Sequence, residues 1–574
     1  MVESTWLALL TLLGAQSAGS EASKGAPPAA QSPQALADLI DATLKKAWKE
    51  RDLDAAASTD DATWLRRLSL DLCGTIPERE EVAAFLADDR VDRRARKIDE
   101  YLADRACAQN LSELWSNALL AGAQRGPEGA RLRPWLEEQF AANAPFADVT
   151  RALVASTGRN DEIGATSFAL SYADDIEALA AVTARTLLGV QIQCAQCHDH
   201  PYDRWKQTDF NGFAGFFYGI RARKVGDSPP IFQLSDATPR ELRRDQLRKL
   251  VGYLRKQRME DGEMGEMGDP GEMDLEQYLS TLPAAARERI EKARERQKNF
   301  SEARFLDGSP CRDSEMLPRR AALAEWIVDP DNPYFAQATA NRLWGLLFGK
   351  GLVEPIDDLT GSQDKILPQL LATVASQFRQ SGTDLRYLLS AFARTRAYAA
   401  GNSLEKDAER RADQERWFAA HPLRSFTAEQ VLHSLLRATA TEGRQIPRRR
   451  GDEFEAARRK LLEKFRYVFN DDEGGDADRF ASSIPQALFL MNDRMTNEEI
   501  TLKRSKMLDE ILDETRTDRE RQRQVFYATL GRPPSQREAE KLGRLVKGAS
   551  GGGKKGIEDL YWALLNSTEF LTNH

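Results

Sequence analysis

DDIEALAAVTARTLLGV, residues 174–190, is the stretch that decides the fold. Its large apolar side chains recur every three or four positions, which is the period of one face of an α-helix. Two acidic residues precede the run, at the end where negative charge stabilises a helix. The pattern therefore predicts an amphipathic helix that buries one face, formed by Ile176, Leu179, Val182, Leu187 and Val190.

The same helical period extends outward from this stretch in both directions. It dominates residues 34–221, and it returns over residues 319–574. In the second region Thr427 and Gln430 have the spacing of a capping box, and an apolar stripe follows them. We therefore expect a mainly α protein with two helical domains, N-terminal over 34–221 and C-terminal over 319–574.

A charged segment separates the two predicted domains. Residues 258–274, RMEDGEMGEMGDPGEMD, carry seven acids against one base and repeat Gly-Glu-Met three times. Such a segment buries little apolar surface, so we predict a charged, partly disordered linker over 222–318. Alternating runs of strand length are scarce, and only residues 216–234 and 305–311 are expected to hold a few short strands.

The N-terminus has the pattern of a secretory signal peptide over residues 1–19. An apolar run over residues 6–13 is followed by Ala15 and Ser17, spaced as at a signal-peptidase site. No Lys or Arg precedes the run, so the alternative is a buried apolar helix. Residues 20–33 are small, polar and proline-containing, which predicts a flexible lead. We expect an exported protein, periplasmic or at the cell surface.

Composition excludes several classes of protein. The 574 residues include 89 acidic and 81 basic side chains, a net charge of -8, so no basic field would attract nucleic acid. No stretch of the mature chain is long and apolar enough to span a membrane. Five cysteines are too few for a disulfide scaffold, although Cys73 and Cys107 are expected either to form one disulfide or to remain buried thiols, and Cys311 is left over.

The chemistry of the chain is concentrated in QCAQCHDHPYDRW, residues 193–205. Within it, Cys194, Cys197 and His198 form a C-x-x-C-H motif, the pattern of c-type haem attachment. There the two thiols add to the haem vinyl groups, and the histidine beside the second thiol becomes an axial ligand of the iron. Attachment of this kind takes place outside the bacterial cytoplasm, which agrees with the predicted signal peptide.

Two other interpretations of the motif remain open. Cys194, Cys197 and His200 would suit a zinc or iron site with a fourth ligand from elsewhere. The two cysteines would alternatively act as a dithiol or disulfide, although no βαβ pattern surrounds them. Haem therefore implicates His198, and zinc or iron implicates His200.

Residues near and far from the motif are further candidates. Phe210, Phe213 and Phe217 would either wall a haem pocket or belong to the core, and Arg204 and Lys206 would either pair with haem propionates or lie on the surface. No second axial ligand is evident; the distant candidates are His421, His433, Met491 and Met495.

Several stretches resemble a known pair of families. LRRLSLDLCGTIP (65–77) and LLGVQIQCAQCHDHPYDRWKQTDFNGFAGFF (187–217) resemble domain-of-unknown-function family 1549, the planctomycete cytochrome-associated domain. NRLW (341–344), FGKGLV (348–353) and LNSTEF (565–570) resemble family 1553, the planctomycete surface-type domain. The resemblance implies export, helical architecture and a special role for the motif, and it implies no substrate because neither family has an established activity.

Other polar residues in the chain are expected to be structural. Asp71, Asp357, Asp358 and the pair Asn341 and Arg342 are predicted to act as caps or in ion pairs.

The sequence therefore leads to one main hypothesis and two alternatives. The main hypothesis is an exported protein that binds one haem c and acts with a redox partner in electron transfer. One alternative is a binding or scaffold protein with a structural zinc or iron site, in a surface polysaccharide system. The other is a metal-dependent enzyme with an open coordination position. Enzymatic activity is left undecided.

Overall fold

The computed structural model describes residues 30–123, 126–201, 203–237, 241, 303–311, 318–361, 364–440, 462–463, 465–466, 505–548 and 553–574. The predicted signal peptide, most of the flexible lead, the Gly-Glu-Met segment, Met491 and Met495 lie outside these residues. Within them, no helix is long and apolar enough to cross a membrane.

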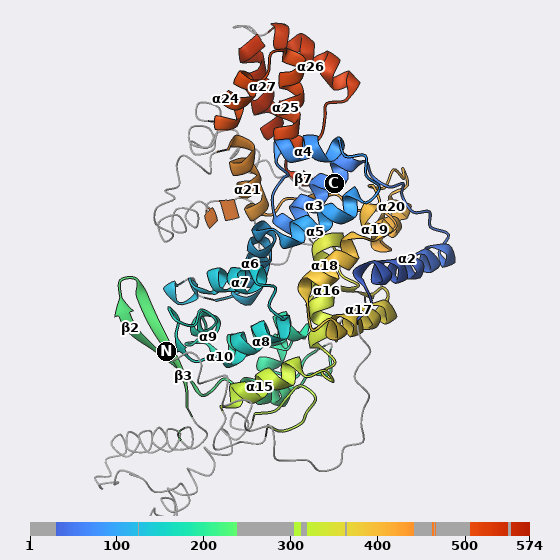
Figure 1. Cartoon of the computed structure of the whole chain (residues 1–574). Coiled ribbons are helices and arrows are strands. Elements are labelled where there is room, and N and C mark those ends of the chain that lie inside the picture. Colours follow the sequence, from blue (N-terminus) through green and yellow to red (C-terminus); the bar gives the residue numbers. More distant parts are fainter. Residues whose placement is uncertain are drawn as a thin grey trace, which may run out of the picture.

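The described chain is mainly α with a few short strands, as the sequence predicts (Figure 1). The helices before residue 220 are α2 (Pro33–Glu50), α3 (Asp61–Cys73), α4 (Arg79–Leu86), α5 (Arg93–Ala103), α6 (Arg105–Leu119), η1 (Pro127–Gly129), α7 (Leu132–Ala141), α8 (Phe146–Ala155), α9 (Thr166–Leu170), α10 (Ile176–Thr183), η2 (Ala184–Leu188), η3 (Gln193–Gln196) and α11 (Gln207–Ala214). Those after residue 318 are α15 (Arg319–Val328), α16 (Phe335–Phe348), α17 (Pro368–Gln380), α18 (Leu385–Ala393), α19 (Arg396–Ala399), α20 (Ala408–Arg416), α21 (Ala428–Thr439), α24 (Lys506–Glu514), α25 (Asp518–Leu530), α26 (Gln536–Gly548) and α27 (Gly553–Leu565).

Local sequence explains where these helices begin and end. The predicted capping box of α21 is present, since Thr427 Oγ1 accepts from the Gln430 N–H and the Gln430 side chain accepts from the Thr427 N–H. Asp175 caps α10 by accepting from the Ala178 N–H at 2.9 Å. The chain then passes through the π-helical turn η2 and leaves the helix at Gly189, whose φ of +61° suits glycine.

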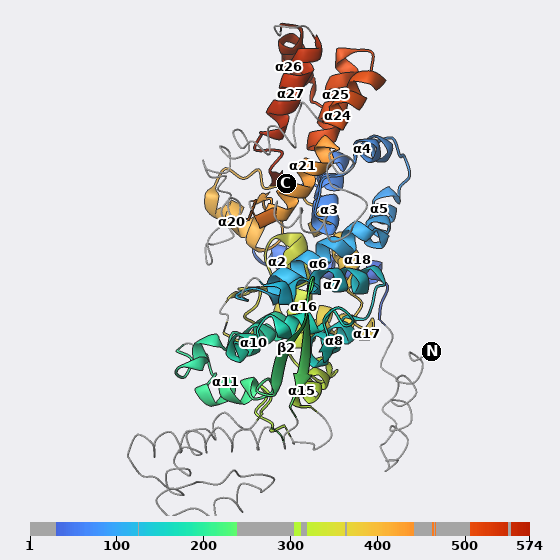
Figure 2. The ribbon, with the colours of Figure 1, turned by 90° about the vertical axis from the view of Figure 1, so that its left-hand side faces the viewer.

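The two helical regions share one hydrophobic core. Phe146 of α8 stacks on Phe335 of α16 with ring centroids 5.7 Å apart, and Trp115 of α6 contacts Phe146 at 4.4 Å. Helix α15 packs along α8, and the two helices lie side by side in the views of Figures 1 and 2. An amphipathic helix must bury its apolar face, and here each region supplies the partner faces of the other.

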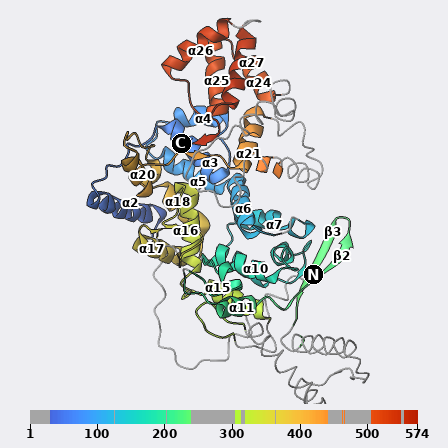
Figure 3. The same ribbon diagram turned by 180° about the vertical axis from the view of Figure 1, so that it is seen from behind.

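A second, smaller core lies at one end of the molecule. Helices α21 and α24 to α27 form it, and they are shown in orange and red at the top of Figures 1 and 3. Leu70 and Ile76, from α3 and the turn after it, complete this core. The N-terminal region therefore contributes to both cores.

The predicted short strands form a small antiparallel sheet. Strands β2 (Ile220–Asp227) and β3 (Pro230–Asp236) make a hairpin, and β1 (Gly158–Arg159) pairs with β3. Residues 222–236 fall within the predicted linker, and the structure places them in this hairpin. At the other predicted stretch, residues 305–311, the structure has one isolated bridge, between Arg304, just before the stretch, and Pro310. The remaining pairs are β4 (Val353–Glu354) with β5 (Asp364–Lys365) and β6 (Arg424–Ser425) with β7 (Thr572–Asn573).

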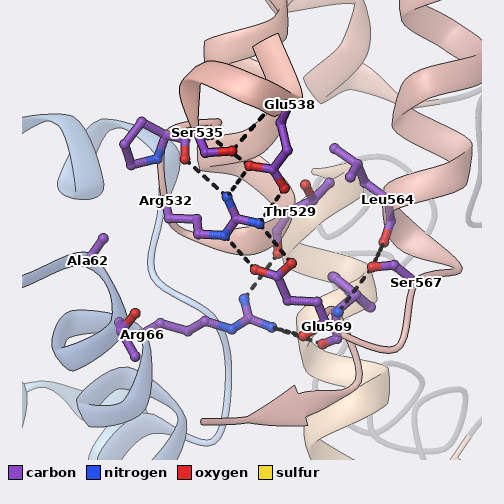
Figure 4. Close-up of polar contacts among 12 residues, drawn as sticks. Ala62, Arg66, Thr529, Arg532, Ser535, Glu538, Leu564, Ser567 and Glu569 are labelled. Atoms are coloured by element: carbon purple, nitrogen blue, oxygen red, sulfur yellow. Dashed lines mark hydrogen bonds and ion pairs between the residues drawn. The ribbon is translucent and has the colours of Figure 1, made fainter. Parts of the chain in front are cut away.

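Three buried charged residues of α3 tie the first region to the last residues of the chain. Arg66 donates to the backbone carbonyls of Thr529 and Phe570 at 3.1 and 2.9 Å. Figure 4 shows this guanidinium beside Glu569, whose carboxylate in turn pairs with Arg532. Arg67 donates to the carbonyls of Tyr398, Ala400 and His574.

The third residue is Asp71, which is only 1% exposed. Its Oδ1 accepts from Arg424 and Asn573, both at 2.7 Å, and its Oδ2 accepts from the Tyr398 hydroxyl at 2.9 Å. We call Asp71 and these three partners the Asp71 centre. It joins α3 to α19, β6 and β7, so the expectation that Asp71 acts in an ion pair is confirmed.

Candidate functional site

The C-x-x-C-H motif begins in η3 and continues into the exposed loop that leads to α11. Cys194, Cys197 and His198 are all exposed, and both thiols are free. Ala195, between the cysteines, is fully buried and fixes the short helix η3 to the core. The chemically active side chains of the motif therefore face outward from an anchored backbone.

The histidine of the motif has a defined tautomer. His198 Nδ1 lies 2.8 Å from the backbone carbonyl oxygen of Asp199. A carbonyl oxygen only accepts, so Nδ1 carries the proton and the neutral ring has its lone pair on Nε2. Nε2 has no hydrogen-bond partner among the described residues. This is the arrangement in which a histidine offers Nε2 to a metal.

The second histidine of the segment is arranged in the opposite way. His200 Nδ1 accepts a hydrogen bond from the backbone N–H of Asp203 at 2.9 Å. The backbone N–H of His200 donates to the Trp205 carbonyl. Because Nδ1 is the acceptor, the proton of the neutral ring is on Nε2. His200 therefore closes the loop over 200–205, whereas His198 remains open to solvent.

Gln207, the first residue of α11, braces the motif. Its side-chain amide donates to the carbonyls of Gln196 and Cys197 at 3.1 and 3.2 Å, and its backbone N–H donates to Asp199 Oδ1 at 3.0 Å. These bonds satisfy carbonyls at the end of η3 that have no helical partner. They hold the cysteine backbone without using the thiols.

Residues of the C-terminal region support the same loop from the other side. Thr360 Oγ1 donates to Asp203 Oδ2 at 2.8 Å and accepts from the Trp205 indole N–H at 3.2 Å. The Leu359 N–H donates to the Gly189 carbonyl at 2.7 Å. The segment after β4 is thus docked on the segment that carries the motif.

Two more contacts complete this docking. The Gln191 side chain donates to Asp357 Oδ1 at 2.8 Å. Arg204 donates to the Tyr334 hydroxyl at 2.6 Å and lies over the Trp205 ring, 4.6 Å from its centroid. The motif loop belongs to the first predicted domain and is held in place by residues of the second.

Asn341 holds the docking segment in shape. Its side-chain amide donates to the carbonyls of Val353 and Ile356 at 2.8 and 3.0 Å, and its Oδ1 accepts from the Val353 N–H. Asp358 accepts from the Gly361 N–H at 2.9 Å. The expected structural roles of Asn341 and Asp358 are confirmed.

The aromatic residues after the motif belong to the hydrophobic core. Phe210, Phe213 and Phe217 are each at most 1% exposed, and Phe213 contacts Phe217 edge to face at 6.2 Å. The sequence left open whether these residues line a haem pocket or belong to the core, and the structure places them in the core. Arg204 is held by Tyr334, and Lys206 is exposed.

The described residues contain no group of three His, Cys, Asp or Glu side chains placed to hold a metal ion. The zinc or iron alternative would need such a cluster from Cys194, Cys197, His200 and a further ligand. A c-type haem needs only two thiols and one histidine from this loop.

The two histidines considered as second ligands of the haem iron, His421 and His433, both have other contacts in the structure. His421 is 1% exposed, and both ring nitrogens lie 3.1 Å from backbone carbonyls, those of Pro422 and Leu347. His433, on α21, lies 3.8 Å from Glu113. His421 is therefore a packed core residue.

Two of the other three cysteines are buried. Cys73 and Cys107 are buried, free thiols, and Cys311 is partly exposed. Burial raises the pKa of Cys107 to about 12 and also raises the pKa of Cys73. The sequence predicts either a disulfide or two buried thiols for Cys73 and Cys107, and the structure shows buried thiols.

Comparison with known proteins agrees with this division of the chain. Residues 39–222 match the family PSCyt2, a protein of unknown function (DUF1549), and residues 319–546 match PSD1, a protein of unknown function (DUF1553). The chain is a paired DUF1549 and DUF1553 protein. The resemblance predicted from the sequence is confirmed. No curated protein and no solved structure matches the chain.

In this DUF1549 and DUF1553 protein, the motif loop is DUF1549 sequence and its support from residues 353–361 is DUF1553 sequence. The sequence predicts a structural role for Asp357 without a partner, and no local pattern singles out Thr360 or Gln191. The available signal was the resemblance itself, because Gln191 and Asp357 lie in or beside the stretches that match the two families.

Proposed function

We propose that this protein is an exported redox protein that carries one c-type haem on the C-x-x-C-H loop. Cys194 and Cys197 would hold the haem through thioether bonds, and His198 Nε2 would be the axial ligand. The observation that carries the proposal is the hydrogen bond from His198 Nδ1 to the Asp199 carbonyl, which leaves Nε2 available.

Two further features support the proposal. The thiols are both exposed and free, so the enzymes that attach haem could reach them. The backbone beneath them is held by Ala195 and by the Gln207 side chain, so attachment requires no rearrangement of the core. When bound, the haem would supply a one-electron redox centre whose potential depends on the axial ligands and on solvent exposure.

An exposed site of this kind suits electron exchange with another protein. Because Cys194, Cys197 and His198 all lie on the surface, a haem on this loop would be close to any docked redox partner. The predicted signal peptide supports a location outside the cytoplasm, periplasmic or at the cell surface, where haem c is attached.

The test is the visible spectrum and the denatured mass of the full chain, exported in a host that attaches haem c. We expect a Soret band that survives denaturation and a covalent mass increase of one haem. The double variant Cys194→Ser/Cys197→Ser should lose both signals, and His198→Ala should shift the absorption bands by removing the iron ligand. Cys311→Ser and His200→Gln are matched controls and should retain the haem.

A colourless protein would overturn the proposal. If that protein carries stoichiometric zinc or iron that His200→Gln removes, the motif is instead a metal site, as in the scaffold and metal-dependent enzyme alternatives. A colourless, metal-free protein with a Cys194–Cys197 bond by mass would identify a dithiol.

A further inference from the structure

Strand β2 is an outer edge of the small antiparallel sheet. The strand order is β1-β3-β2, so β3 lies in the middle and β2 has a neighbouring strand on one side only. The hairpin of β2 and β3 extends away from the helices in Figures 1 and 3. Every residue from Arg221 to Val225 is exposed. β2 therefore presents one side of its backbone to solvent.

The hydrogen bonds of β3 show which backbone groups of that strand face β2. Phe232 directs both its N–H and its C=O toward the β1 side, where they bond to Asn160 at 3.0 Å each. In an antiparallel ladder this direction alternates from one residue to the next. Gln233 and Ser235 therefore direct their backbone groups toward β2.

The same alternation identifies the outward groups of β2. Arg223 and Arg221 lie opposite Gln233 and Ser235, so their backbone groups are used in the ladder. Ala222 and Lys224 have the other orientation, and their N–H and C=O groups point away from β3. No hydrogen bond to these outward groups occurs among the described residues. A β-bulge interrupts the register just after Lys224, so the regular edge ends there.

The base of the hairpin is fixed to the body of the protein. Leu234 of β3 is fully buried. Arg320 of α15 donates to both carboxylate oxygens of Asp236, at 2.8 and 2.9 Å. The Ala237 N–H donates to the Gly219 carbonyl at 2.8 Å. The edge is therefore already formed, and a strand that pairs with it does not have to order it.

The side chains of β2 are basic. Arg221 and Arg223 share one face of the strand, because side chains alternate between the two faces, and Lys224 lies on the other face. Lys224 pairs with Asp227 at 2.8 Å. The Arg223 side chain has no ion pair or hydrogen bond within the part of the chain that the structure describes. Its positive charge is available to a residue opposite it on a neighbouring strand.

This charge pattern distinguishes between the strands that could pair with the edge. A second copy of β2 would place basic side chains opposite basic side chains, and like charges opposite one another destabilise a strand pair. A neutral strand would gain only the backbone hydrogen bonds. A strand with acidic residues at alternate positions gains those bonds and cross-strand ion pairs as well.

We propose that β2 is the docking site for an extended acidic segment of a partner protein, which joins the sheet beside β2. The backbone of that segment bonds to the outward N–H and C=O groups of Ala222 and Lys224. One of its acidic side chains pairs with Arg223, and the positive charge of Arg221 on the same face favours a second acid two positions away. This site is independent of the haem proposed on the C-x-x-C-H loop.

The test is calorimetric titration of the full chain with two synthetic peptides of about eight residues, the length of an ordinary strand. One peptide alternates glutamate with threonine, and the other has lysine in place of each glutamate. The wild type should bind the glutamate peptide and not the lysine peptide. Ala222→Pro removes an outward N–H at a position where an edge strand tolerates proline, and it should weaken binding about tenfold. Ala222→Val is the matched control, because it keeps the N–H and should bind as the wild type does.

A charge variant keeps the test valid if Ala222→Pro disturbs the hairpin. Arg223→Glu should weaken binding of the glutamate peptide about tenfold and should strengthen binding of the lysine peptide. Arg537→Glu is its control, because this exposed arginine lies on α26. In the wild type, the bound glutamate peptide should slow hydrogen exchange at the amides of Ala222 and Lys224.

Four results would overturn the proposal. The first is that the wild type does not bind the glutamate peptide, and the second is that Ala222→Pro binds it as tightly as Ala222→Val. The third is binding that appears only after residues 258–274 are deleted, which would make the chain's own acidic segment the occupant. The fourth is a dimer that Ala222→Pro abolishes, which would make a second copy the occupant.

Discussion

The Asp71 centre and the C-x-x-C-H loop both gather reactive side chains, and they differ in what satisfies them. Asp71 is sealed from water, and each of its oxygens has a partner within 2.9 Å. On the loop, Gln207 bonds the backbone carbonyls and Thr360 bonds the side chains of Asp203 and Trp205, while both cysteines and His198 are exposed.

The difference separates residues that hold the fold from residues that are available for chemistry. A buried charge with all its partners in place holds the surrounding elements together. If one partner is removed, the charge stays buried, and the free energy lost on its desolvation is no longer compensated. An exposed side chain on a rigid backbone contributes little to stability and can bind a ligand. The predictions below test this comparison, from the largest effect to the smallest.

Asp71→Ala should destabilise the protein most. The substitution leaves the buried Arg67 and the partly buried Arg424 without their counter-charge, and breaking a buried ion pair costs about 3–5 kcal/mol. The free energy of unfolding, measured by urea denaturation, should fall by that amount. Asp99→Ala is the matched control, because Asp99 pairs with Arg394 at the surface and its loss should cost under about 1 kcal/mol. Equal losses in the two variants would contradict the role of the Asp71 centre.

His421 should make the stability depend on pH. Burial, and then the charges of Arg67 and Arg424, hold the pKa of His421 well below 6.5, although the carbonyls of Pro422 and Leu347 act in the opposite direction. Because the unfolded chain binds a proton below pH 6.5 and the folded chain does not, this contribution is present above pH 6.5 and is lost as the pH falls. Between pH 7 and 5 the loss should approach about 2 kcal/mol.

The measurement is urea denaturation at both pH values for the wild type and His421→Gln. The variant should show a smaller decrease, because glutamine does not titrate. An identical decrease in both proteins would mean that other groups cause the pH dependence.

The motif side chains should affect stability least. His198→Ala and Cys194→Ser, in haem-free protein, should change the free energy of unfolding by less than about 0.5 kcal/mol, because these side chains are exposed and make few contacts. Thermal melts of the variants check this expectation. A loss similar to that of Asp71→Ala would show that the loop is structural after all.

Local sequence was sufficient for much of the fold. The capping box at Thr427 and the strands near residues 220 and 234 occur where they were predicted, because caps and strand alternation depend on neighbouring residues. The stretch 174–190 is helical, but it divides into α10 and the π-helical turn η2 before Gly189. Its apolar period does not reveal that the last turn widens.

The candidate site was predicted in part. The motif identifies Cys194, Cys197 and His198 from spacing alone, and the haem that we propose there stays a prediction. The contacts of Asp357 and Thr360 with this loop join residues more than 150 positions apart. Helical periodicity carries no information about such pairs.

The sequence by itself determined that the protein is mainly α and that it pairs two families of domains, and it supplied the cysteine–histidine motif on which the proposed function rests. Only the tertiary structure decided that both domains share the larger core, that His198 Nε2 has no partner among the described residues, and that Asp71 joins α3 to β6 and β7. The physical reason is that periodicity and spacing are properties of neighbouring residues. Burial, tautomer and long-range ion pairs depend on which distant segments meet when the apolar faces pack.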